Sequence, residues 1–123
     1  MTKRERDETR EERIAMEIIV DAYGAEEQAM GWYYYLEDKL HFPFRARCIQ
    51  PRSISPLHAG DELILERLAP ADECLHDVFA LATWHGRVMG FPLAQLEAMA
   101  ADEETLEAIG DWHYWVERGY GFD

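Results

Sequence analysis

The chain has 123 residues, with 25 Asp and Glu against 12 Lys and Arg, which gives a formal net charge of −13. This length fits a single domain, and the acidic balance argues against nucleic acid or an anionic membrane as a partner, because phosphates would be repelled. The chain has only two cysteines, which argues against a disulfide framework. Its charged N-terminus is unlike a signal peptide, and it has no apolar run of about 20 residues that could span a membrane. These features predict a cytoplasmic protein.

The first part of the chain predicts two helices. Residues 1–13 hold five bases and five acids and predict a charged tail or helix extension, followed by one domain over residues 14–123. Apolar residues at helical spacing from Ile14 predict a helix that ends at Gly24. A second helix begins at Glu26 and must end before Pro43. Its predicted buried stripe consists of Ala29, Tyr33, Leu36 and Leu40, with Trp32 alongside.

The middle of the chain predicts short antiparallel strands. They are expected at residues 44–49, 62–68, 78–84 and 88–91, with His85 and Gly86 as a hairpin turn. Residues 92–96 predict a helical turn that closes a small barrel. Asp102 is a good cap for a last helix. The predicted buried stripe of that helix consists of Leu106, Ile109, His113 and Val116. The pattern is that of an α+β domain.

Known catalytic and metal motifs are absent from the sequence. It has no Gly-rich phosphate loop, no G-x-S-x-G and no H-E-x-x-H, and we expect no enzymatic activity. No EF-hand frame can be placed on any segment. Cys74 and His76, with Cys48 as a remote third ligand, leave a zinc site as an alternative, although a structural zinc site needs four ligands.

Some acids stand where a helix end disfavours them. Glu37 and Asp38 fall in the last turn of the second helix, and Asp21 falls in the last turn of the first. An acid there costs about 0.3–1 kcal/mol, because the unpaired carbonyls already carry negative charge. A bound cation would reverse the sign of this effect. The alternative is that these acids face solvent or pair with nearby bases, and Asp111, in the last helix, is open to the same interpretation.

Several motifs together resemble one family. They are EIIVDAY at residues 17–23, AMGWYYYLEDKL at 29–40, FPF at 42–44, ISPL at 54–57, PLAQLE at 92–97 and DWHYW at 111–115. These motifs are similar to those of the small acidic calcium-binding proteins first described in cyanobacteria. The resemblance implies a calcium binder without an EF-hand, acting as an intracellular buffer or sensor, and in cyanobacteria that role is linked to heterocyst differentiation.

The resemblance makes Asp38 the leading candidate calcium ligand, followed by Glu37 and Asp21, and then Asp111. The acidic loop at residues 72–77 could form a second, weaker site. The expected fold is a small SH3-like antiparallel β-barrel flanked by two N-terminal helices and one C-terminal helix, with Ca²⁺ bound by carboxylates where helices and barrel meet. The alternative function is an acidic interaction module that docks a basic protein and has no specific metal site; which protein that would be is unknown.

Overall fold

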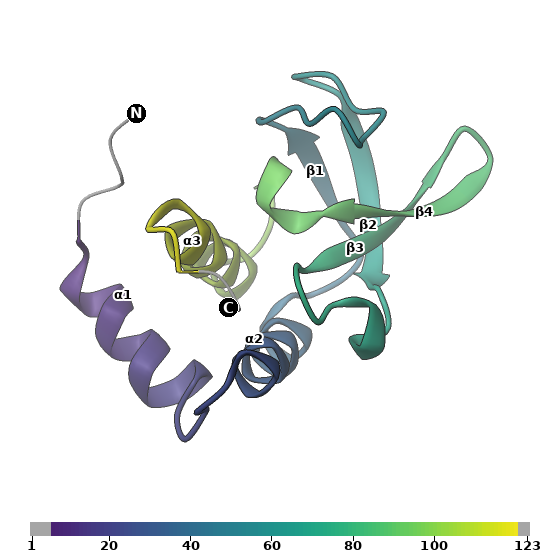
Figure 1. Ribbon diagram of the computed structural model, residues 1–123. Coiled ribbons are helices and arrows are strands. Elements are labelled where there is room, and N and C mark those ends of the chain that lie inside the picture. Colours follow the sequence, from purple (N-terminus) through teal and green to yellow (C-terminus); the bar gives the residue numbers. More distant parts are fainter. Residues whose placement is uncertain (1–5, 121–123) are drawn as a thin grey trace.

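The computed structural model describes residues 6–120. Helices and sheet form two sides of the molecule (Figure 1). The helical elements are α1 (Glu8–Arg13), a π-helical turn (Ile14–Ile18) that continues α1, α2 (Ala25–Lys39), two short 3₁₀ turns (Ala71–Glu73 and Leu93–Gln95) and α3 (Glu103–Glu117). The strands are β1 (Phe44–Cys48), β2 (Glu62–Leu68), β3 (Phe79–Trp84), β4 (Arg87–Pro92) and β5 (Leu96–Met99).

The five strands form one antiparallel sheet in the order β4-β3-β2-β1-β5. β4 and β5 are the two edges, and the sheet is not closed into the SH3-like barrel that the sequence analysis predicts. β5 was also missed as a strand. It pairs with β1, more than forty residues earlier in the chain, and places Glu97 opposite Arg47. A four-residue strand held by so distant a partner has too weak a local pattern to be read from sequence.

Helix α2 forms as predicted and supplies the centre of the helical layer. Gly24 precedes it, and Glu26 and Glu27 occupy its first turn. The four residues of the predicted stripe and the adjoining Trp32 are all buried. The Trp32 ring is 5.1 Å from Trp112 and 5.6 Å from Trp115, both on α3. The aromatic cluster therefore joins α2 to α3.

Helix α3 buries a different face from the predicted stripe. Asp102 caps it as expected, accepting from the Thr105 backbone N–H, but Leu106 and Val116 are exposed. The buried residues are Thr105, Ala108, Ile109, Asp111, Trp112, Tyr114 and Trp115. This broad buried surface includes polar positions because α1 packs on α3 as a second neighbour, and Tyr114 Oη accepts a 2.9 Å bond from the backbone N–H of Asp7.

Candidate metal site

The four predicted ligands lie in three separate places. Asp21 belongs to the turn before α2, Glu37 and Asp38 to the last turn of α2, and Asp111 to the middle of α3. The length of α2 alone separates Asp21 from Asp38 by about 20 Å. Within residues 6–120, no group of three or more His, Cys, Asp or Glu side chains is already arranged to hold a metal ion. The chain therefore has no preformed cage in its described part.

Asp111 is a fully buried carboxylate held by two arginines of the N-terminal helical segment. Its Oδ1 accepts from Arg10 Nη1 and Arg13 Nη2, both at 2.7 Å, and its Oδ2 accepts from Arg13 Nε at 2.9 Å and Tyr35 Oη at 2.8 Å. Its side chain is 0% exposed. The bond to Asp111 holds the pKa of Arg13 above its ordinary value, and burial together with the same carboxylate raises the pKa of Tyr35. With four bonds to donors, the oxygens of Asp111 are occupied within the fold.

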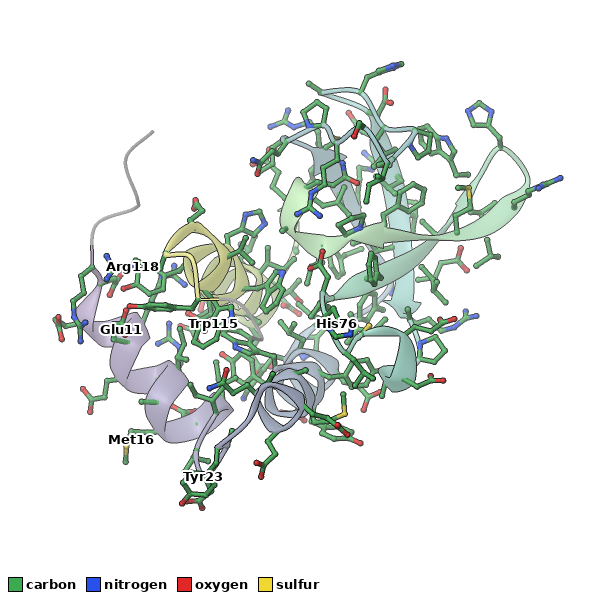
Figure 2. All side chains as sticks on the ribbon, viewed as in Figure 1. Glu11, Met16, Tyr23, His76, Trp115 and Arg118 are labelled. Carbon is green, nitrogen blue, oxygen red and sulfur yellow. The ribbon has the colours of Figure 1, made fainter. Side chains whose placement is uncertain are left out.

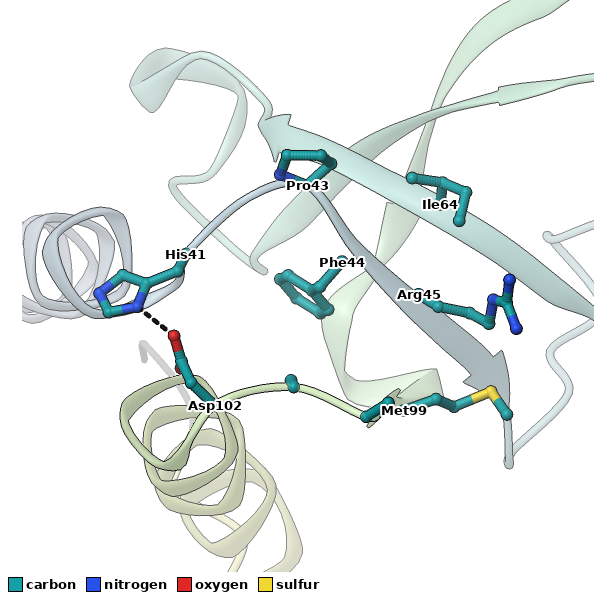
Figure 3. A pocket seen from close by; sticks show the side chains of 9 residues that line it. His41, Pro43, Phe44, Arg45, Ile64, Met99 and Asp102 are labelled. Atoms are coloured by element: carbon teal, nitrogen blue, oxygen red, sulfur yellow. Dashed lines mark hydrogen bonds and ion pairs between the residues drawn. The ribbon is translucent and has the colours of Figure 1, made fainter.

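Asp38 lies where the end of α2 meets the start of α3, and it is linked to two acids of that region, Glu104 and Asp102, through shared ion-pair partners. Lys39 Nζ is 3.8 Å from Asp38 Oδ2 and 3.4 Å from Glu104 Oε2. His41 Nε2 is 3.0 Å from Glu104 Oε1, and its Nδ1 bonds to Asp102 (Figure 3). Three carboxylates from two helices thus surround one lysine and one histidine. We call these five residues the α2–α3 junction.

The electrostatics of the junction favour the ionised form of Asp102 and the charged form of His41. Bonds from the Thr105 backbone N–H and then from His41 lower the pKa of Asp102 to about 2. The bond to Asp102 raises the pKa of His41, and the charges of Asp102, Glu104 and Asp38 add to this effect. Side-chain exposures of 77% for Asp38 and 53% for Glu104 leave both open to solvent. The junction is an accessible, concentrated negative charge.

The donor chemistry of the junction fits a hard cation. Three carboxylates carry six oxygens, close to the roughly 6–8 that Ca²⁺ takes, and water and the free carbonyls at the end of α2 can supply the remainder. Lys39 and His41 compensate part of the negative charge of the three carboxylates. The His41 side chain is 48% exposed and that of Lys39 is 33% exposed, so neither is held in these ion pairs by full burial. From sequence, Asp102 is recognised only as a helix cap, because its meeting with His41 depends on the packing of α2 against α3.

Asp21 belongs to a second acidic region, in the turn before α2. Its backbone has φ 59°, in the left-handed region that Asp tolerates better than most residues. Glu26 and Glu27 lie close by in the first turn of α2, and all three are exposed. In the loop at residues 72–77, by contrast, Asp77 binds Arg52 at 3.2 Å.

The zinc alternative has no support from the geometry. Cys74 is buried with its Sγ 3.9 Å from the carbonyl oxygens of Ala69 and Phe79, and burial raises the pKa of its thiol. His76 is exposed. Cys48 is buried elsewhere, next to Gln95. A thiol that is buried and protonated, without further ligands in the described residues, is a core residue.

No helix in residues 6–120 is long and apolar enough to cross a membrane.

Comparison with known proteins finds one family and two solved structures. A family model described as calcium binding, that of CcbP, matches residues 12–116. The crystal structure of CcbP from Anabaena is 45% identical, with a TM-score of 0.85 over 98% of both chains. A calcium-binding protein in its calcium-binding form is also 45% identical, with a TM-score of 0.81 over 98% of both chains. No curated protein sequence matches the chain.

Proposed function

Because the chain belongs to the CcbP family of calcium-binding proteins, we propose that it binds Ca²⁺ reversibly through the carboxylates of the α2–α3 junction. Asp38, Asp102 and Glu104 are the proposed ligands, with Glu37 beside them on the last turn of α2. The supporting observation is that carboxylates from the end of α2 and the start of α3 share the cations of Lys39 and His41. Calcium would replace the ion pairs that Lys39 and His41 now make.

A second, weaker site is proposed at Asp21 with Glu26 and Glu27. These acids are exposed and lie in the turn before α2 and in the first turn of α2. They come from one continuous segment, whereas the acids of the junction come from two. Asp111, which the resemblance also suggested, is proposed to be a structural residue instead. A calcium ion there would have to displace two arginines from a buried carboxylate, and such a displacement leaves buried charge uncompensated.

The proposed role is that of a cytoplasmic calcium buffer or sensor without catalytic activity. The family is described by calcium binding and not by a reaction. Ion pairs between Lys39 and Glu104 and between His41 and Asp102 join α2 to α3, so their loss on calcium binding would loosen or shift this contact. A sensor would show such a shift by NMR, whereas a buffer would bind without it.

The test is calorimetric titration of Ca²⁺ into chelator-treated protein in millimolar Mg²⁺ and physiological salt. Asp38→Asn and Asp102→Asn each remove one charge at constant size, and Asn preserves the helix cap at position 102. We expect each to weaken binding about tenfold or more, since calcium affinity depends on ligand charge. Glu66→Gln, an exposed acid on β2, is the matched control and should change affinity less than about twofold.

Two results would contradict the proposal. If Asp38→Asn and Asp102→Asn bind calcium as tightly as the Glu66→Gln control, the heat comes from a diffuse acidic surface. If Mg²⁺ abolishes binding, the site lacks selectivity for calcium. Asp21→Asn tests the second site separately: it should remove the weaker phase of the titration and leave the tighter one unchanged.

A further inference from the structure

An apolar patch is exposed where the chain turns from the π-helical turn into α2. Met16 is 67% exposed, Val20 53% and Tyr23 87%. Met16 lies in the π-helical turn, and Val20 and Tyr23 lie in the non-helical segment that follows it. Figure 2 shows the side chains of Met16 and Tyr23 at this corner of the molecule, away from the sheet. Single exposed apolar residues are ordinary, but here three fall within eight residues of one segment, and Val20 also lines a groove, which indicates an interaction surface.

A groove of about 640 Å³ lies between this turn and α2. Val20, Ile18 and Met30 line it with apolar side chains, and Gly24 and Gly31 line it with backbone. Gly31 is essential to its shape, because a Cβ at this position would lie 2.3 Å from the carbonyl oxygen of Ile18. The groove is large enough for one or two apolar side chains of another molecule.

The rim of this groove is purely acidic. Residues 14–38 contain six acids and no Lys, Arg or His. Asp21, Glu26 and Glu27 line the groove itself, and Glu17 is exposed on the adjoining turn. Within residues 6–120 none of these four carboxylates has an ion-pair partner, in contrast to the paired carboxylates Asp77 and Asp111. A ligand for this surface must therefore supply both apolar and positively charged groups.

We propose that this groove docks a basic amphipathic helix of a partner protein. The apolar face of the helix would fill the groove beside Val20, Tyr23 and Met30, and its Lys and Arg side chains would pair with the acidic rim. A second copy of the chain is disfavoured because each copy carries a formal charge of −13. Anionic lipid is disfavoured for the same reason.

The probe is a fluorescein-labelled peptide of Leu and Lys, about 18 residues long, with Leu at helical spacing along one face. Its binding is measured by anisotropy in EGTA, so that the outcome is separate from that of the calcium titration. The double variant Val20→Ser/Tyr23→Ser should weaken binding about tenfold or more, because it removes the apolar contacts. Ile54→Ser, which alters an 81% exposed residue in the loop between β1 and β2, is the matched control and should bind within about twofold of wild type.

The charge of the rim is tested with Glu17→Gln/Glu26→Gln, which should weaken binding and reduce its salt dependence. All variants alter exposed side chains, and circular dichroism confirms their folding. The proposal is overturned if Val20→Ser/Tyr23→Ser binds the peptide like Ile54→Ser. It is also overturned if a peptide of scrambled sequence binds equally well. The third result that overturns it is that Val20→Ser/Tyr23→Ser abolishes self-association of the chain or its binding to anionic vesicles, while its affinity for the peptide stays unchanged.

Discussion

Asp111→Asn should lower the free energy of unfolding of the calcium-free protein by about 3–5 kcal/mol. Asp111 is fully buried and accepts four bonds of 2.7 to 2.9 Å from Arg10, Arg13 and Tyr35. Asn keeps the volume but removes the charge and turns an amide N–H₂ group toward these donors. About two charge-assisted bonds are lost, each worth roughly 1.5–3 kcal/mol, which agrees with the cost of breaking a buried ion pair.

Urea unfolding in EGTA, followed by tryptophan fluorescence, measures this loss directly. Glu107→Gln is the matched control, since Glu107 lies one turn earlier on α3, is 56% exposed and is 3.9 Å from the same Arg13. It should cost about 0.5 kcal/mol or less, because an exposed pair is screened by water. The reasoning is refuted if Asp111→Asn costs no more than Glu107→Gln. Loss of calcium affinity at unchanged stability would instead make Asp111 a ligand.

Three further predictions concern the calcium-free fold. Gly31→Ala should lower the unfolding free energy by about 1–3 kcal/mol, because the added Cβ meets the backbone oxygen of Ile18. This loss is expected in spite of the better helix propensity of Ala. An unchanged urea midpoint would contradict the close approach. Because the pKa of His41 is raised in the folded state, its contribution to the unfolding free energy is fully present below about pH 6.5 and is lost as pH rises through the pKa of the folded state. His41→Asn should remove this part of the pH dependence of stability. An NMR titration that gives His41 a pKa at or below about 6.5 would disprove it. Asp102→Ala should cost about 1 kcal/mol in urea unfolding through loss of the bond to the Thr105 N–H, whereas Asp102→Asn should keep most of that energy; equal losses would exclude the cap as the cause.

The parts of the fold that were predicted correctly have local signals. Strand β2 spans residues 62–68 as expected, and the stripe of α2 is buried as expected, because the alternation of a strand and the spacing of a helix are read over a few residues. The cap at Asp102 is equally local. The family resemblance, which rests on short motifs, is confirmed by the match over residues 12–116.

The parts that were wrong depend on distant segments. The buried face of α3 was misplaced because α1, about a hundred residues earlier, covers Asp111 and Tyr114. The barrel was expected to close, but β5 pairs with β1 and leaves β4 as the other edge. Pairings over such separations have no signature within either segment.

The acidic charge, most of the elements and the family follow from the sequence alone. Only the tertiary structure distinguishes the roles of the individual acids. Asp38 and Asp111 are the same side chain on two helices, yet one is exposed beside Lys39 and the other is buried between two arginines. The physical reason is that the behaviour of a carboxylate depends on its solvation and on the cations near it. For Asp111 and Asp102 those cations come from distant parts of the chain, and packing alone decides which of them arrive.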